Sequence, residues 1–394
     1  MIVYEIYNIY NIYNFKYKII AIRNMLVAQT ITQTKKQFFD SMYIISHSDK
    51  TIQTYNTALN HFEKFLKSHY HCDEHQIVEQ IKYDKIDVYV VVRDFVIYLD
   101  QKRIRPRGIQ SYLSGLKGYL RYMGIKISSD DFKQFVKTPK VTKTREIPVT
   151  KEMILRILHN SPPKLQTAIL LCTSSGLRIG ELTQLRLSDI DFESNPTKLS
   201  IRAEIAKGNM SRETFVTSEA TYALQDYLKR YFGWKKNESN FHLQNTMIFG
   251  RISVTKNGSK PKFSLESAKQ ILQASLRNQI EKITELNVRN ENGLRAVHFH
   301  AFRKFFRTTV GNVCGRDYAE ALMGHGFYMD TYYQLPEDKK KQMYLDAESQ
   351  LTISDFKEVE KNIKKISEKN TQLEEKFNDL LQYLRTNSIE VPNF

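Results

Sequence analysis

Cysteine, long apolar runs and acidic side chains are the scarce features of this 394-residue sequence. Its three cysteines, Cys72, Cys172 and Cys314, are odd in number and far apart, so we expect no disulfide framework. Cys72 stands among histidines, but the second ligand pair that zinc sites usually add is missing, so no metal site is predicted. No apolar run approaches the roughly 20 residues that cross a bilayer, and there is no signal-peptide layout. We therefore expect a cytoplasmic protein without a membrane anchor.

The shortage of acidic residues leaves the chain strongly basic. Asp and Glu number 43 against 59 Lys and Arg, which gives a formal net charge of +16. An excess of this size predicts a polyanionic partner, either nucleic acid or an anionic membrane. The length is too great for one hydrophobic core and predicts two or three domains.

Residues 1–47 are expected to be an N-terminal extension. Its first 24 residues begin with a short, low-complexity repeat of Tyr, Asn and Ile, and Met25 follows directly. One hypothesis is that translation starts at Met25, so that the repeat is not part of the native product.

Residues 48–127 are predicted to form a small helical domain, because apolar residues recur at helical spacing and Pro106 stands where a helix can begin. The end of this stretch has no Asp or Glu between Gln101 and Ile127. Such a face is either ordinary solvated surface or a contact with the DNA backbone, and the run of cations favours DNA. The candidate DNA-binding residues are Lys102, Arg103, Arg105, Arg107, Lys117 and Arg121. A basic, proline-containing linker is expected over 128–149.

A second domain is predicted over 150–352. Within it, an apolar helix is expected to end near Cys172, and after a turn a new helix starts. Arg178 and Glu181 then lie one turn apart near the N-terminus of the new helix, where backbone N–H groups also attract anions. Arg178 is accordingly either a phosphate clamp or a structural partner of Glu181.

Residues 199–217 predict two short strands joined by a turn at Lys207, Gly208 and Asn209. A lysine at the tip of a hairpin is usually just solvated. Its functional alternative is a flexible proton donor that reaches into bound DNA, which requires the rest of a site nearby.

The stretch from His298 to Tyr333 carries the most reactive side chains. Its phenylalanines recur at helical spacing, so His300 and Arg303 should lie one turn apart on one side of a helix. His325 and the pair Tyr332 and Tyr333 follow. Each of these residues alone has an ordinary explanation in packing or surface. Together they suit a phosphodiester, because Arg binds phosphate oxygens, His moves protons and Tyr can attack phosphorus.

Beyond Ile353 the apolar residues alternate spacings of three and four, which is a heptad seam. Asn370 falls at an a position, where a buried amide costs stability but selects register and often a two-stranded state. Residues 353–394 are therefore predicted to form a coiled-coil helix through which the chain self-associates. The alternative is a single helix packed on the second domain.

These motifs resemble the tyrosine recombinases, or phage-type integrases, over about residues 48–352. TSSGLRIGEL resembles the motif of the first catalytic arginine, AKGNMSRE the hairpin of the catalytic lysine, HAFR the His-x-x-Arg box, and MGH the Gly-His motif. The resemblance implies that the catalytic residues are Arg178, Lys207, His300, Arg303 and His325, with Glu181 as a supporting acid.

The nucleophilic tyrosine departs from the family pattern. Tyr332 and Tyr333 lie seven and eight residues after His325, whereas the family's nucleophile usually stands slightly further on. The segment resembles archaeal members with a Ser-Tyr-Tyr sequence and a later tyrosine. Alignment of Tyr344 with that later tyrosine favours Tyr332, and counting from His325 favours Tyr333. Both stay candidates.

The resemblance implies a mainly α fold with a small β-sheet, in which a helical core-binding domain and a catalytic domain enclose double-stranded DNA. It implies strand exchange through a 3′-phosphotyrosine, with neither metal nor high-energy cofactor, in a synaptic assembly of several copies. An archaeal mobile element would be one source of such a recombinase. Two alternatives stay open: a type IB topoisomerase that only nicks and reseals, and a non-catalytic DNA-binding architectural protein on a decayed scaffold.

Overall fold

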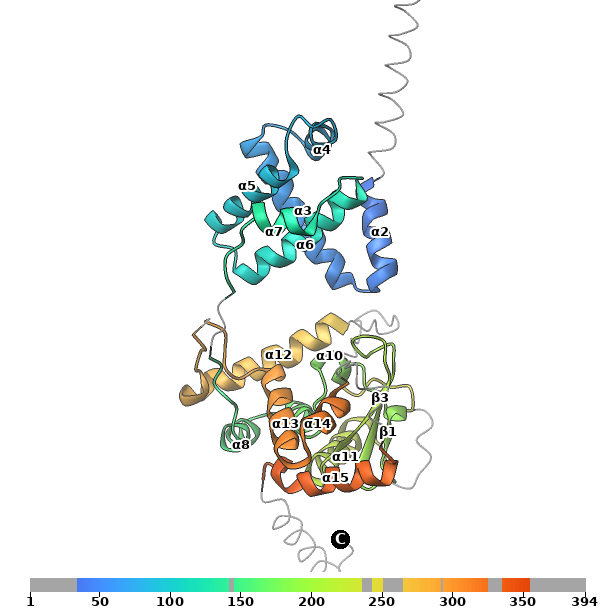
Figure 1. The fold of residues 1–394 in the computed structure, drawn as a ribbon. Coiled ribbons are helices and arrows are strands. Elements are labelled where there is room, and N and C mark those ends of the chain that lie inside the picture. The colour runs from blue at the N-terminus through green and yellow to red at the C-terminus, as the bar shows by residue number, and fades with distance from the viewer. Residues whose placement is uncertain are drawn as a thin grey trace, which may run out of the picture. The chain divides into compact units, whose positions relative to one another are not determined.

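The computed structural model describes residues 34–141, 145–235, 243–250, 265–291, 293–324 and 335–354. The chain divides into two compact units, residues 1–143 and 144–394, which are described separately (Figure 1). The predicted coiled coil from residue 355 onward and the repeat before Thr34 lie outside the described residues. No helix in the described part of the chain is long and apolar enough to cross a membrane.

In the described residues of the first unit, every regular element is a helix. Its elements are α2 (Thr34–Ser46), α3 (Asp49–His69), α4 (Glu74–Lys82), α5 (Val88–Gln101), α6 (Pro106–Tyr122) and α7 (Ser129–Phe135). Local chemistry marks the starts of these helices. The hydroxyl of Ser48 accepts from the backbone N–H of Thr51, Asp73 forms a capping box with Gln76, and Pro106 opens α6 as expected.

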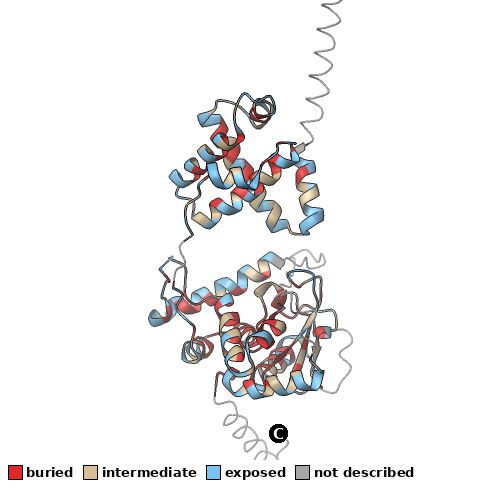
Figure 2. Ribbon diagram, in the orientation of Figure 1, coloured by how far each residue is buried: buried red, intermediate tan, exposed pale blue. Residues whose placement is uncertain are grey.

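Helices α3 and α6 pack closely at the centre of this unit. A side chain at Gly115 would bring its Cβ to 2.8 Å from the ring of Tyr55, so the crossing depends on glycine there. Helix α2 lies in the stretch that the sequence analysis assigned to the N-terminal extension, yet its Phe38 is 0% exposed. The ring of Phe38 packs edge-on against Tyr119 at 5.5 Å between centroids. Buried residues of this kind form the hydrophobic core of the unit, and Figure 2 shows buried positions along its helices.

The second unit consists of a small sheet and the helices packed around it. Its elements are α8 (Lys151–His159), α9 (Pro163–Ser175), α10 (Ile179–Leu182), η1 (Leu187–Asp189), β1 (Ile190–Asp191), β2 (Thr197–Ile201), β3 (Arg212–Val216), α11 (Ser218–Phe232), α12 (Leu265–Lys282), η3 (Thr284–Leu286), α13 (Phe299–Cys314), α14 (Arg316–Met323) and α15 (Glu337–Leu351). The strands run antiparallel in the order β1-β2-β3, and Ile201 pairs with Arg212 next to the hairpin turn. The prediction of a mainly helical fold with a small sheet is confirmed.

Helix α9 runs through the core of this unit, with every residue from Thr167 to Ser175 buried. It is longer than the sequence predicted, because it passes Cys172 and ends at Gly176. The hydroxyls of Thr173, Ser174 and Ser175 donate to carbonyl oxygens four residues earlier, which lets polar side chains continue a buried helix. Arg178 is therefore the N-cap of α10 and not a residue inside it.

Candidate active site

The carboxylate of Glu181 organises the site. Glu181 is 1% exposed and lies on the short helix α10. Its Oε2 accepts the backbone N–H of Arg178 at 2.8 Å, and its Oε1 accepts from Nη1 of Arg178 at 2.8 Å. Arg212, the first residue of β3, donates from Nη1 to Oε1 at 3.1 Å and from Nη2 to Oε2 at 2.7 Å. The carboxylate thus holds two guanidinium groups, one from Arg178 and one from Arg212.

These bonds set the ionisation of Glu181. Burial raises the pKa of its carboxyl, but the hydrogen bonds and charges of Arg212 and then Arg178 outweigh burial, so the pKa is lowered overall. The side chain of Arg178 remains 24% exposed. Of the two readings that the sequence left open, Arg178 is shown to be a partner of Glu181, and its exposure keeps it accessible to an anion.

Arg303 lies on α13 and is 2% exposed. It joins the ends of two other helices, because Nη1 donates to the carbonyl of Gly176 after α9 and Nη2 donates to the carbonyl of Met323 at 2.8 Å. Burial and the neighbouring charge of Arg178 lower the pKa of Arg303 to about 10. The structure therefore brings three of the candidate residues together, namely Arg178, Glu181 and Arg303.

His300 precedes Arg303 by one turn of α13 and is exposed. Burial of part of its ring and the charge of Lys304 lower its pKa, and His298 and Arg303 lower it further. Lys304 itself forms an ion pair with Glu146, whose charge raises the pKa of His300. An imidazole of this kind is mostly neutral at pH 7 and can accept a proton.

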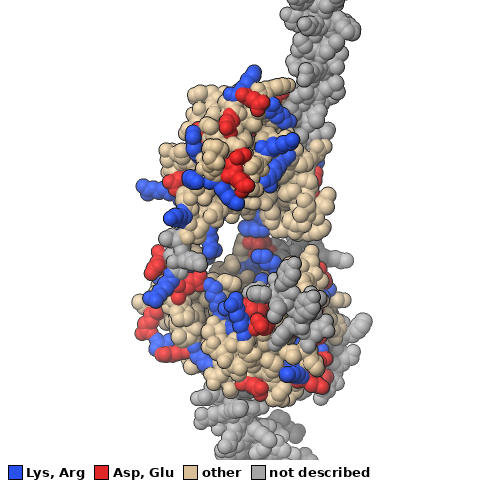
Figure 3. Space-filling view, viewed as in Figure 1, with Lys and Arg blue, Asp and Glu red and all other residues tan. Residues whose placement is uncertain are grey.

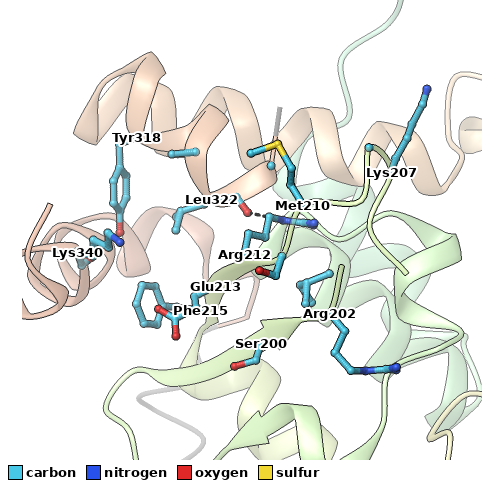
Figure 4. Close-up of a pocket in the computed structure, with 15 residues that line it drawn as sticks. Ser200, Arg202, Lys207, Met210, Arg212, Glu213, Phe215, Tyr318, Leu322 and Lys340 are labelled. Carbon is cyan, nitrogen blue, oxygen red and sulfur yellow. Dashed lines mark hydrogen bonds between the residues drawn. The ribbon is translucent and has the colours of Figure 1, made fainter. Parts of the chain in front are cut away.

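Lys207 is exposed on the turn between β2 and β3, where the sequence placed it. The hairpin and α14 line a groove of about 820 Å³ that includes Lys207, Arg212, Leu322 and Gly324. Figure 4 shows Arg212 inside this groove, with the amino group of Lys207 directed away from it. The hairpin is thus confirmed, while contact between Lys207 and the arginines is not seen.

His325, Tyr332 and Tyr333 lie outside the described residues, so their place relative to the arginines is not given.

The candidate DNA-binding cations lie at the end of α5 and along α6. Lys102, Arg103, Arg105, Arg107 and Arg121 are exposed, whereas Lys117 is half-buried with its amino group 4.3 Å from the ring centroid of Phe132. Burial and the charge of Arg121 lower the pKa of Lys117. Figure 3 shows lysines and arginines across the visible face of this unit, with acidic side chains among them.

Sequence reasoning missed Arg212. The residue stands five positions after Lys207 beside Glu213, and nothing local separates it from the chain's many exposed cations. Its importance comes from partners 31 and 110 residues away.

Comparisons with known proteins agree with this architecture. A model of the phage integrase family matches residues 148–329, and a model of the phage integrase SAM-like domain matches residues 32–125. Tyrosine recombinase XerA of Saccharolobus solfataricus is 25% identical over 218 residues, which are 55% of this chain and 69% of that protein. XerA of Thermococcus kodakarensis is 25% identical over 152 residues, which are 38% of this chain. The chain spans only 50% of the length of that relative.

The fold also matches solved structures. Residues 75–356 of lambda integrase, solved as a dimer bound to a COC′ core site, align with a TM-score of 0.51 and 16% identity over 78% of this chain and 99% of that one. A lambda integrase tetramer bound to a Holliday junction aligns with a TM-score of 0.50 and 16% identity, covering 78% of this chain and 80% of that one. The two family models match the helical unit and the unit that carries the arginine cluster, and the chain belongs to the phage integrase family.

Proposed function

We propose that this chain is a site-specific DNA recombinase or integrase that cleaves and rejoins double-stranded DNA through a 3′-phosphotyrosine intermediate. The observation that carries the proposal is the cluster of Arg178, Glu181 and Arg303 in a member of the phage integrase family. An arginine held by a buried carboxylate, with part of its side chain exposed, suits a phosphate that gains negative charge as it is attacked.

Each candidate residue has a role in this chemistry. Arg178 binds the scissile phosphate, and the positive field of buried Arg303 adds to it. His300, with its lowered pKa, exchanges a proton or hydrogen-bonds at the phosphate together with His325. Lys207 protonates the leaving 5′ oxygen from the turn between β2 and β3. Tyr332 or Tyr333 supplies the nucleophile, and the bond energy is kept in the phosphotyrosine for rejoining.

The helical unit is proposed to contact the DNA backbone through its exposed cations. Phosphate contacts of this type fix register and make binding depend steeply on salt. Self-association is part of the proposal, because exchange between two duplexes needs several protomers. The lambda integrase structures that share this fold are a dimer and a tetramer on DNA.

A suicide-substrate assay tests the proposal. The protein is incubated, without divalent metal, with supercoiled plasmid and then with nicked duplexes that carry the cleavage sequence so found. We expect a covalent adduct whose DNA-linked peptide, sequenced by mass spectrometry, contains Tyr332 or Tyr333. Relaxed plasmid from a monomer, without recombinant products, would favour a topoisomerase. Tight binding to a verified site with no adduct would overturn the proposal in favour of an architectural protein.

A further inference from the structure

Arg212 is a nearly buried cation whose guanidinium makes three hydrogen bonds. Its side chain is 6% exposed. Two of the bonds go to the carboxylate of Glu181, and the third runs from Nε to the carbonyl oxygen of Leu322 at 2.9 Å (Figure 4). One side chain therefore ties together the start of β3, the short helix α10 that carries Glu181 and the end of α14.

The turn after α14 is built around the same side chain. Gly324 caps α14 with a φ of +65°, a conformation that glycine adopts without strain. A Cβ at Gly324 would lie 2.5 Å from Cδ of Arg212, so backbone and arginine stem touch here. In the sequence, Gly324 is followed immediately by the candidate catalytic His325. The stem of Arg212 thus packs against the last described residue before that motif.

The charge of Arg212 also determines how many hydrogen bonds Arg178 makes to Glu181. Arg178 donates a single side-chain bond, from Nη1 to Glu181, and among the described residues its other guanidinium nitrogens have no hydrogen-bond partner. Arg212 supplies two of the hydrogen bonds that Glu181 accepts. Without Arg212, the buried carboxylate would draw Arg178 into a bidentate pair, because an unpaired buried charge is costly. The guanidinium would then turn away from a bound anion.

We propose that Arg212 is a positioning residue, which neutralises Glu181 so that Arg178 stays directed at the scissile phosphate. The inference rests on the proposed function and extends it to a residue that does not itself touch the DNA. Its consequence is specific: loss of Arg212 should impair the recognition of phosphate charge.

The test compares two suicide duplexes that differ in one atom group at the scissile position. One carries the native phosphodiester, and the other carries a methylphosphonate, in which a methyl group replaces a charged oxygen. Full-length wild type, Arg212→Met, Arg212→Lys and Arg202→Met are assayed for the rate of adduct formation on both. Arg202 is the matched control, because it lies on the same hairpin and is ion-paired, but to Asp189 and Glu204.

Arg212→Met is expected to slow adduct formation on the native phosphodiester by about 100-fold, the usual cost of misplacing a group that binds the reacting phosphate. On the neutral methylphosphonate the loss should be much smaller, since less charge needs to be neutralised. Arg202→Met should keep the wild-type ratio of the two rates. Because both rates come from one preparation, the fraction of folded protein cancels from the ratio.

A ratio for Arg212→Met equal to that of wild type would overturn the positioning role while leaving the proposed function intact. If Arg212→Met gives no adduct on either duplex, the ratio measured on Arg212→Lys decides in the same way. Lysine cannot form the paired bonds to both carboxylate oxygens of Glu181, so one oxygen would still draw Arg178 towards it. A wild-type protein that forms no adduct on a verified site overturns the proposed function, and the role of Arg212 with it.

Discussion

The buried carboxylate of Glu181 makes the fold sensitive to acid. Its pKa is lowered in the folded state, because the hydrogen bonds and charges of Arg212 and Arg178 outweigh the effect of burial. A carboxyl of this kind stabilises the folded protein at pH values above the pKa that it has when unfolded. That stabilisation is lost as the pH falls through the folded-state pKa.

Glu181→Gln is expected to reduce the free energy of unfolding at pH 7 by about 3–5 kcal/mol, because it removes one partner of a buried ion pair. The difference from wild type should shrink as the pH falls below 4.5, the ordinary value for this carboxyl. Urea unfolding at a series of pH values measures both effects. Glu204→Gln is the control, since its partner Arg202 pairs with it at the surface and little should be lost. A difference independent of pH would contradict this role.

Two side chains of opposite charge act on the imidazole of His300. Lys304 lowers its pKa and Glu146 raises it, and these two side chains are paired with each other. Glu146 precedes α8, so this ion pair also joins the start of the second unit to the helix α13 that carries His300.

Removal of each charge should move the titration of His300 in a different direction. Glu146→Gln is expected to lower the pKa of His300, and Lys304→Met to raise it, because each change removes the named charge. NMR titration of the imidazole resonances in the full-length protein measures both shifts. Glu152→Gln, which removes an exposed carboxylate that pairs with Arg156, should leave His300 unchanged. Shifts of the same sign in Glu146→Gln and Lys304→Met would refute this arrangement.

At the scale of elements, the turn after α9 determines how α13 can approach. Gly176 caps α9 with a φ of +65°, and a Cβ there would lie 2.5 Å from the ring of Phe306 on α13. The carbonyl of the same residue accepts from Arg303. The glycine therefore serves two purposes, a left-handed turn and close contact with the helix that carries His300 and Arg303.

A pair of alanine substitutions separates these purposes. Gly233 caps α11 with a φ of +66° and has nothing within 4 Å of the Cβ position, so Gly233→Ala measures backbone strain alone. We expect that variant to lose about 1–2 kcal/mol of unfolding free energy. Gly176→Ala should lose about 2–5 kcal/mol, because steric overlap adds to the strain. Denaturant unfolding measures both losses. Equal losses would mean that the ring of Phe306 moves aside at no cost in free energy.

At the scale of the whole molecule, each unit has its own hydrophobic core. One core cluster lies between Phe38 and Val136, and the others lie between Val149 and Ile353. The last described residues of the second unit are bound to its interior, because Glu219 accepts the backbone N–H groups of Ile353 at 2.8 Å and of Ser354 at 3.0 Å. Removal of the chain beyond Ser354 should therefore leave this unit intact.

Deletion of residues 355–394 is expected to lower the oligomeric order while cleavage at a single site survives, because the heptad seam is proposed to join protomers. In the full-length protein, Leu373→Glu places a charge in the seam and should act in the same way. Asn378→Glu places the same charge outside the seam and is the control. Analytical ultracentrifugation with and without DNA measures the result, and an unchanged profile in both seam variants would exclude this route of assembly.

Much of the fold and part of the site followed from local pattern. Helical periodicity placed His300 and Arg303 one turn apart on α13, and turn residues placed Lys207 between β2 and β3. The prediction was less accurate where polar side chains continue a helix, as Ser174 and Ser175 do in α9. A serine whose hydroxyl donates to a carbonyl oxygen of its own helix cannot be told from a turn residue by sequence.

By itself the sequence determined many of the elements, the resemblance to the family and the side chains available for chemistry, because these depend on spacing over a few residues. Only the tertiary structure decided which charges meet. Arg212 binds Glu181 across 31 residues, and Arg303 binds the carbonyl of Gly176 across 127. Such pairings depend on how helices and strands pack, and an ion pair is favourable in a buried position only where that packing brings its partner within hydrogen-bonding distance. No local pattern carries that information.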